Sequence, residues 1–278
     1  MSSQLFNRRI TLTVGPKGED GLFITELRIK FRVEQSSEAN ANKARIEVYN
    51  LSKSSRQLVE KPGNYLILNA GYGASPGRVF EGDIPPGGVL TQKAGPDFVT
   101  VFEAGDGLKQ LQSAQVNQSF KPGINIRDVF ETVADTFGLG KGAREGVQDE
   151  FLSNGLAVAG DSKAIMSQLT AKMGLVWNVQ DGVLHIHPVG GARPGKALLI
   201  SAKTGLIETP RRGDKQIEIK SLLQAQIRPG VLISLDSDFL KGELIVDKVI
   251  HEGDNYEKSF YSTIEVNQKE KPADVQFT

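Results

Sequence analysis

Short runs of alternating apolar and polar residues, separated by glycine and proline, fill the first and last thirds of this chain. In the run LFITELRIKFRVEQ, the odd positions 27–33 are apolar, and the positions between them are Arg28, Lys30 and Arg32. A side-chain period of two is typical of a strand with one buried face. Thirty glycines and twelve prolines supply the tight turns that many short strands need. The first hundred residues therefore predict five or six strands in a small barrel or sandwich.

The middle third changes to a helical period. Apolar residues recur at spacings of three and four within 126–137 and again within 165–173, and the two runs end at Gly138 and Gly174. Asp161 or Ser162 is the expected N-cap of the second helix, and Ser52 is the expected cap of an earlier short one. After Gly190 the chain returns to short alternating runs.

These changes of period predict a mainly β fold with an α+β insert, in which two small β-barrel domains flank a small α/β segment. The expected divisions are an N-terminal β-barrel at 1–108, an α/β insert at 109–190, a C-terminal β-barrel at 191–270 and a loose tail at 271–278.

Composition limits the classes of function. Lys+Arg and Asp+Glu both number 33, so the chain as a whole has no basic field to attract nucleic acid or an anionic membrane. There is no cysteine, which excludes disulfides and thiolate chemistry. The N-terminal residues lack an apolar stretch of signal-peptide length, and no run is long enough to span a bilayer. We expect a protein assembled in the cytoplasm, without membrane insertion.

Two of the three histidines lie in LVWNVQDGVLHIHP at 175–188. Asp181-Gly182 between alternating runs predicts a β-hairpin, with His185 and His187 on one face of the returning strand. Two histidines could supply part of a zinc site, but a usable site needs at least three protein ligands, and no third is near in sequence. The pattern favours surface residues on a hairpin, so we expect no metal.

Other motifs give no catalytic site. The nucleophile-elbow and phosphate-loop signatures are absent from the sequence. GLGKGAREG at 138–146 follows a helix rather than a strand, which favours a mobile loop over a phosphate-binding loop. The Arg-Gly-Asp at 212–214 favours a turn with a basic flank over an adhesion motif. We therefore expect no catalytic residue and no cofactor.

Several pieces in a fixed order resemble one family. They are YNLS at 49–52, AGYG at 70–73, FEGDI at 80–84, GLIETP at 205–210, SLLQAQIRPG at 221–230 and VIHEGDN at 249–255. This order is similar to that of the baseplate hub proteins of long-tailed phages, which include hubs related to that of phage T4 and the late-control D proteins. The segment that ends in the hairpin resembles the small α/β part between the two barrels of such hubs, so the likeness covers nearly the whole chain.

The resemblance implies a structural protein of the virion tail rather than an enzyme. In such hubs three copies form a ring that joins the hexameric tail tube to the trimeric central spike. The implied partners are two further copies, tail-tube or tube-initiator proteins, the spike protein and other baseplate proteins, with DNA only passing through the lumen. By this resemblance we expect no lysozyme-like or spike domain of the kind that some hubs carry, and the resemblance favours a contractile tail.

Five basic residues are the candidates for an interface or a lumen surface: Arg28, Lys30, Arg32, Arg211 and Arg212. A solvated strand face is the alternative for each. Two other functions stay open from the residues alone. One is a carbohydrate-binding or hydrolytic β protein of the tail, which would need paired carboxylates or an aromatic platform. The other is a monomeric adaptor for tail assembly.

Overall fold

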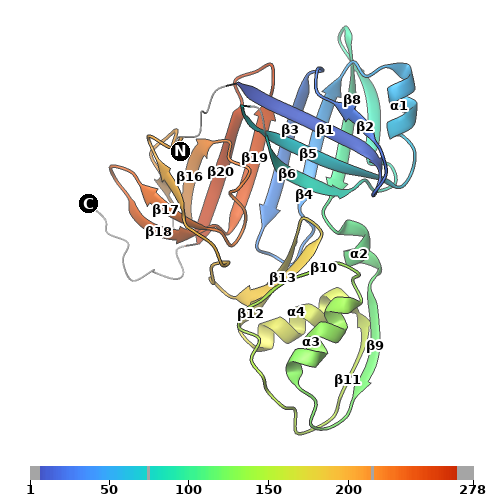
Figure 1. The fold of residues 1–278 in the computed structure, drawn as a ribbon, viewed down its shortest axis with the longest axis vertical. Coiled ribbons are helices and arrows are strands. Elements are labelled where there is room, and N and C mark those ends of the chain that lie inside the picture. Colours follow the sequence, from blue (N-terminus) through green and yellow to red (C-terminus); the bar gives the residue numbers. More distant parts are fainter. Residues whose placement is uncertain (1–6, 74–75, 214–215, 268–278) are drawn as a thin grey trace.

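In a computed structural model, the structure describes residues 7–73, 76–213 and 216–267. The predicted tail at 271–278 lies outside the described residues. The chain is mainly β with a small α/β insert, as the sequence predicts. Figure 1 shows the insert extending from one end of the molecule, away from two neighbouring groups of strands.

The N-terminal module contains eight strands and one helix. Ser52 caps the helix as predicted, because its hydroxyl accepts a hydrogen bond from the Ser55 N–H. The elements are β1 (Arg8–Pro16), β2 (Leu22–Ile24), β3 (Ile29–Ser36), β4 (Lys43–Tyr49), α1 (Lys53–Val59), β5 (Asn64–Tyr72), β6 (Gly77–Asp83), β7 (Val89–Ala94) and β8 (Asp97–Gly105).

The insert combines three helices with two small sheets. Its elements are α2 (Leu108–Ser113), β9 (Gln115–Phe120), α3 (Ile126–Asp135), β10 (Gly140–Arg144), β11 (Leu156–Asp161), α4 (Ser162–Lys172), β12 (Leu175–Gln180) and β13 (Val183–Pro188). Asp161 caps α4, and Asp181 and Gly182 take positive φ values in the two-residue hairpin turn, as predicted.

One local prediction for the insert was wrong, and one helix was not predicted. The segment around 140–144, expected to be a mobile loop, forms β10 and pairs in parallel with β13. Helix α2 was not predicted, because six residues are too few for a helical period to appear.

The C-terminal module is all β. Its strands are β14 (Leu198–Ser201), β15 (Arg211–Arg212), β16 (Gln216–Leu222), β17 (Leu232–Asp236), β18 (Lys241–Ile245), β19 (Lys248–Asp254) and β20 (Phe260–Asn267).

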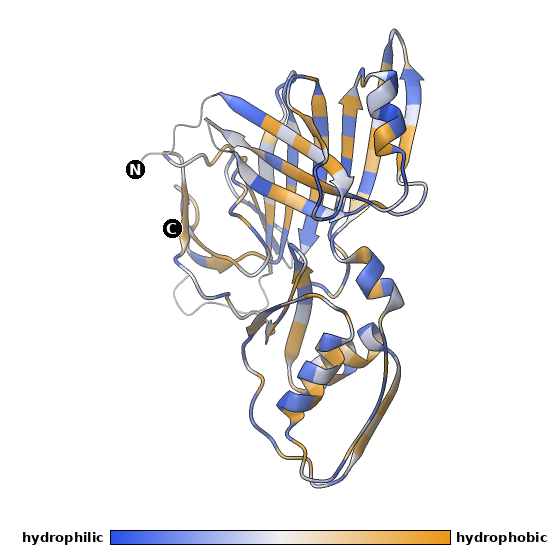
Figure 2. Ribbon diagram, turned by 45° about the vertical axis from the view of Figure 1, so that its right-hand side comes forward, coloured by the Kyte–Doolittle hydropathy of each residue, from blue (hydrophilic) through white to orange (hydrophobic). Residues whose placement is uncertain are grey.

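One sheet of twelve strands passes through both β modules. Its order is β15-β16-β20-β19-β3-β4-β8-β6-β5-β1-β2, with β7 also paired to β8. The two β modules therefore share a sheet instead of forming separate ones, because β19 pairs with β3. Figure 2 shows polar and apolar residues alternating along its long strands, which gives the sheet one buried face.

Three hydrophobic cores lie in the N-terminal module, the insert and the C-terminal module. The first core also takes in Leu223 and Phe260 from the C-terminal module. The ring of Phe260 meets those of Phe31 and Tyr72 edge-on, at centroid distances of 6.5 and 5.2 Å. The domain boundaries at 108/109 and 190/191 stay a prediction. None of the helices in the described part of the chain has the length and apolar character needed to cross a membrane.

The insert core offers a direct test of packing, since it contains the only tryptophan of the chain, Trp177, which is 1% exposed. Phe130 lies in the same core and is fully buried. We expect Phe130→Ala to lower the free energy of unfolding by about 3–5 kcal/mol, because it leaves a cavity. Denaturation followed by Trp177 fluorescence measures this. Phe151→Ala is the control: Phe151 is 69% exposed, so we expect a change within about 0.5 kcal/mol. Equal losses in the two variants would contradict the described core.

Candidate assembly surface

The pairing of β19 with β3, here called the seam, holds the two β modules together. His251 lies at its centre, fully buried. Its Nε2–H donates to the Ile227 carbonyl at 3.1 Å, and the Ser262 hydroxyl donates to its Nδ1 at 2.8 Å. Burial lowers the pKa of His251 to about 3, so the ring is neutral near neutral pH. The seam thus has a satisfied polar group inside its apolar core.

Arg28 strengthens one end of the seam. Its guanidinium donates to Asp254 Oδ2 at 2.8 Å, pairs with Glu257 and lies over the Tyr49 ring. Asp254 is 1% exposed, and its Oδ1 also accepts from the backbone N–H groups of Tyr256 and Glu257. Burial raises the pKa of Asp254, but the hydrogen bonds from Arg28 and the backbone outweigh it, so the pKa is lowered overall. Arg28 is therefore a half-buried residue of the seam, held in ion pairs, rather than a free surface cation.

The outer face of the shared sheet carries rows of opposite charge. Ion pairs cross the strands from Arg32 Nη1 to Glu252 Oε1 at 2.7 Å and from Arg45 Nη1 to Glu103 Oε1 at 3.1 Å. Two rows follow from the strand registers: Tyr261–Glu252–Arg32–Arg45–Glu103, and Arg211–Glu218–Glu265–Lys248. The first row continues from the C-terminal module into the N-terminal one, so the two modules share a polar surface, whereas the second row lies within the C-terminal module.

The structure brings four of the five predicted basic residues to this face. The registers place Lys30, Arg32 and Arg211 on it, and Arg28 binds Asp254, which lies opposite Lys30. Arg212 lies opposite Ile217, whose side chain is buried on the other face. The sequence predicts a basic face for this strand, and the structure corrects that prediction. Asp254 and Glu257 pair with Arg28, Glu34 and Glu252 pair with Arg32, and Glu208 pairs with Arg211, so the face is mixed in charge. A single strand's pattern cannot reveal the residues of the strands beside it.

The tip of the β12–β13 hairpin is the point where all three modules meet. Both oxygens of Asp106, from the N-terminal module, accept backbone hydrogen bonds from the turn: Asp181 N at 2.6 Å and Gly182 N at 2.8 Å. From the C-terminal module, Arg228 pairs with the Asp181 carboxylate at 3.2 Å and donates to the Arg78 carbonyl. We call this set of contacts the junction.

A second pair of contacts supports the junction. The Asn42 side chain donates to the Val179 carbonyl at 2.8 Å, and Gln180 donates to the Ser36 carbonyl at 3.4 Å. Asp106 is 2% exposed, and burial raises its pKa to about 6 although the two N–H groups favour its charged form. Sequence reasoning missed Asp106, Asn42 and Arg228. The only signal was a turn motif, AGDGL at 104–108, which says nothing about what the carboxylate contacts.

The prediction that His185 and His187 are surface residues was wrong. His187 is 4% exposed, and its ring lies within hydrogen-bonding distance of Asn178 and the Pro188 carbonyl. His185 is half-buried, and its Nδ1 accepts from the Ala143 N–H at 3.2 Å. Burial lowers the pKa of both, that of His185 to about 4. The unpredicted strand β10 pairs with β13 and contacts His185, whereas the partners of His187 are Asn178 and Pro188. Among residues 7–73, 76–213 and 216–267, no group of three His, Cys, Asp or Glu side chains could hold a metal ion.

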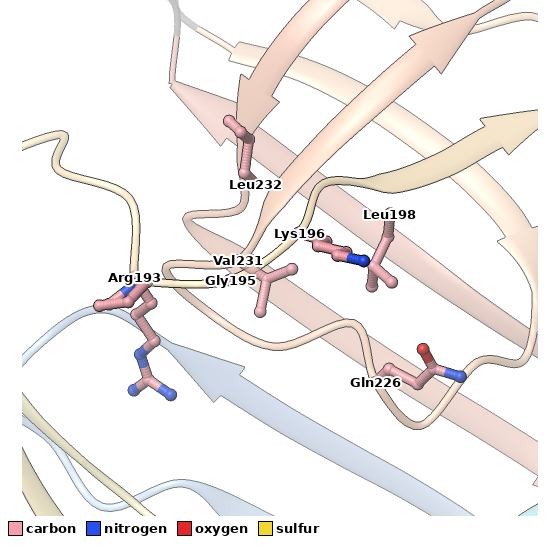
Figure 3. Close-up of a pocket in the computed structure, with 8 residues that line it drawn as sticks. Arg193, Gly195, Lys196, Leu198, Gln226, Val231 and Leu232 are labelled. Carbon is pink, nitrogen blue, oxygen red and sulfur yellow. The ribbon is translucent and has the colours of Figure 1, made fainter.

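A shallow pocket lies where the linker after the insert passes the C-terminal module (Figure 3). Arg193, Lys196 and Gln226 are its polar side chains, and the rest of the lining is apolar or glycine. The guanidinium of Arg193 points away from the other labelled residues in Figure 3 and donates to Asn178 Oδ1 at 3.1 Å. The lining of this pocket contains neither paired carboxylates nor an aromatic platform, so it lacks the groups that sugar binding or hydrolysis would need.

Comparison with known families gives a match along nearly the whole chain. A family model described as "Baseplate hub gp41" matches residues 8–266. No curated protein sequence matches the chain.

Solved structures share the fold at low sequence identity. The 43 kDa tail protein of prophage MuSo2 from Shewanella oneidensis is 11% identical, with a TM-score of 0.67 and coverage of 94% of this chain and 98% of that one. The tail protein from Neisseria meningitidis MC58 is 10% identical, with a TM-score of 0.67 and coverage of 95% and 97%. The E. coli c3393 protein, described as a component of the type VI secretion system, is 10% identical, with a TM-score of 0.62 and coverage of 94% and 77%.

The seam predicts a contrast between two neighbouring basic residues. We expect Arg28→Ala to lower the free energy of unfolding by about 3 kcal/mol, because it leaves the buried Asp254 carboxylate without its cation. Lys30 is exposed on the same face, so we expect Lys30→Ala to change it by about 0.5 kcal/mol or less. Urea denaturation of the two variants measures both values. Similar small losses would contradict the role of Arg28 in the seam.

The junction predicts a particular pH dependence. The pKa of Asp106 is higher in the folded protein, about 6, than in the unfolded chain, so its contribution to stability is full below about pH 4 and is lost as the pH rises through 6. Subtracting the free energy of unfolding of Asp106→Asn from that of the wild type isolates this effect. We expect the difference to fall by about 1 kcal/mol between about pH 5 and pH 7.5. A flat or rising difference would show that burial does not control this carboxylate.

Proposed function

The chain belongs to the baseplate hub gp41 family, and from this premise we propose that three copies form a ring that joins the hexameric tail tube to the trimeric central spike. As a baseplate hub, the protein is a structural component of the phage tail. The proposed partners are two further copies, the tail-tube or tube-initiator proteins, the spike protein and other baseplate proteins. We also propose that the tail is contractile.

The observation that carries the proposal is the continuous sheet through the seam. Each copy has two β modules joined side by side by β19 and β3. Three such copies around an axis would present six β modules to a sixfold tube while keeping true threefold symmetry toward a spike. A rigid seam matters for this role, because the spacing of the two modules within a copy must equal the spacing between copies.

Open strand edges at the two ends of the polar face support ring closure. In the described part of the chain, β7 pairs only with β8 at one end, and β15 pairs only with β16 at the other. Head-to-tail pairing of unlike edges closes a ring when the rotation per copy is right. This would give the backbone groups at the β7 edge a partner.

The charged rows suit a surface that lines the lumen. Lys30, Arg32 and Arg211 lie there with acidic neighbours, so positive and negative charges are interspersed. A strongly basic lumen would bind the DNA backbone and slow its passage, whereas a mixed face holds it weakly. We therefore assign Lys30, Arg32 and Arg211 to the lumen, and Arg28 to the seam.

We propose a role without enzymatic activity. The baseplate hub family supports a structural role, and the pocket in Figure 3 has neither the carboxylate pair nor the aromatic groups of a sugar-processing site. Turnover of a polysaccharide by the purified protein would favour the hydrolytic alternative, and a chain that is always monomeric would favour an assembly adaptor.

Native mass spectrometry of the purified protein tests ring formation. The chain has a mass of 30.2 kDa, and we expect a species of three chains to grow with protein concentration. Thr91→Pro is the informative variant. The Glu103 N–H donates to the Gly88 carbonyl, so the antiparallel register directs the Thr91 N–H toward the free edge of β7. Proline removes that donor, and the three-chain species should be lost. A monomer at every concentration would contradict the ring.

A further inference from the structure

The polar face of the shared sheet ends in apolar side chains at the β7 edge. Leu90 of β7 is 60% exposed. It lies opposite Val101, in the row that continues through Glu47 to Lys30, so its side chain is on the charged face. Val101 and Val99, on the same face of β8, are buried. Leu90 is therefore the exposed member of a small apolar cluster at this edge.

The opposite edge of the face has a second cluster of the same kind. Ile207 is 45% exposed. Its N–H donates to the Lys220 carbonyl beside an isolated antiparallel bridge, so it lies opposite Lys220 on the polar face. Leu222 and Tyr261 are half-buried on the same face. Figure 1 shows β16 and β8, which lie next to the two clusters, on opposite sides of the joined β modules.

The positions of the two clusters are informative. Single exposed apolar residues are common on soluble proteins, but Leu90 and Ile207 share one face, and each lies at one end of it with the charged rows between them. Contacts between subunits place apolar side chains at their centre and polar ones around it. Since one copy cannot bring its own opposite edges together, the arrangement is that of two halves of a contact between copies.

We propose that Leu90 of each copy packs against Ile207 of the next copy around the ring. This inference rests on the three-copy ring proposed above, and it names the side chains through which neighbouring copies meet. The contact is head-to-tail because it joins unlike edges, so repeats of it close a ring when the rotation per copy is right. All copies then point the same way along the axis, and the ring keeps unlike faces toward the tube and the spike.

The strand directions fit this contact. Eight segments lie side by side across the polar face, and each is antiparallel to its neighbours: 205–208, β16, β20, β19, β3, β4, β8 and β7. Because the number is even, the first and the last run in opposite directions. The 205–208 segment of one copy therefore lies antiparallel to β7 of its neighbour, and the alternation of directions continues around the ring.

The backbone directions bring the two side chains close. The N–H of Ile207 points to β16, and in the register of β7 the N–H of Leu90 points to β8. Residues that meet in this way form a non-hydrogen-bonded pair, the position at which opposite side chains are closest. The Leu206 N–H already donates to the Ser201 carbonyl at 2.8 Å, so the 205–208 edge offers no complete ladder. The contact therefore depends on the two apolar side chains.

Charge-swap variants test the contact through the mass of the assembly, measured by sedimentation equilibrium. We expect Leu90→Asp and Ile207→Lys each to raise the concentration needed for the three-chain species by at least about tenfold, because each places a charge against an apolar side chain. The double variant brings the two opposite charges together, so we expect it to recover most of that loss. Phe23→Asp is the matched control. Phe23 is 61% exposed but lies on β2, outside both clusters, and its replacement should leave the mass unchanged.

Cysteine pairs test the same contact by cross-linking. The chain has no cysteine, so an engineered pair supplies its only thiols. Cysteines in place of Leu90 and Ile207 cannot join within one copy, since six strands lie between them, but they are within disulfide reach where two copies meet. We expect mild oxidation of Leu90→Cys/Ile207→Cys to give a covalent species of three chains. Phe23→Cys/Ile207→Cys is the control and should remain a single chain under denaturing conditions.

These measurements separate the contact from the ring, with circular dichroism reporting that each variant is folded. The contact is overturned, and the ring is left standing, if the wild type forms the three-chain species but the single charge variants associate equally well. A loss that the double variant does not recover, or a cysteine pair that gives no covalent three-chain species, has the same meaning. A wild type that stays a single chain at every concentration would overturn the ring and this contact together.

Discussion

The antiparallel pairing of β19 with β3 is the constraint on which the rest of this structure depends. It joins strands more than 200 residues apart in sequence into one sheet, and it fixes the distance and angle between the two β modules. The Arg28–Asp254 pair crosses the seam at its end and fits this register, while His251, buried in the seam, is hydrogen-bonded within the C-terminal module. A slip of one residue would turn every side chain to the opposite face, and it would break the charged rows.

The junction gives the insert its position relative to that sheet. The hairpin turn at Asp181–Gly182 is held by Asp106 from one β module and by Arg228 from the other. Because the contacts to Asp106 use backbone N–H groups, they depend on the turn's geometry more than on its side chains. The insert is thus attached where the two β modules meet. All three modules contact one another at this one turn.

Local features of the fold could be predicted from the sequence, and long-range ones could not. The alternation in 27–33, the caps Ser52 and Asp161, and the Asp-Gly turn all depend on neighbouring residues, and each was confirmed. The pairing of β19 with β3 depends on residues far apart, and no pattern in either strand specifies its partner. The same limit explains the candidate surface. Arg32 looked basic in its own strand, but Glu252 from β19 neutralises it. The histidines looked exposed, but His185 contacts β10 and His187 is buried beside Asn178 of β12.

The central claim is that the shared sheet of each copy faces the axis of a threefold ring. A cryo-electron microscopy map of the assembled tail, at a resolution that separates strands, measures this directly. We expect three copies around the axis, with the charged face of β20, β19, β3 and β4 lining the lumen and the inserts further out. Density for this chain away from the axis, or a ring in which that face points outward, would contradict the account.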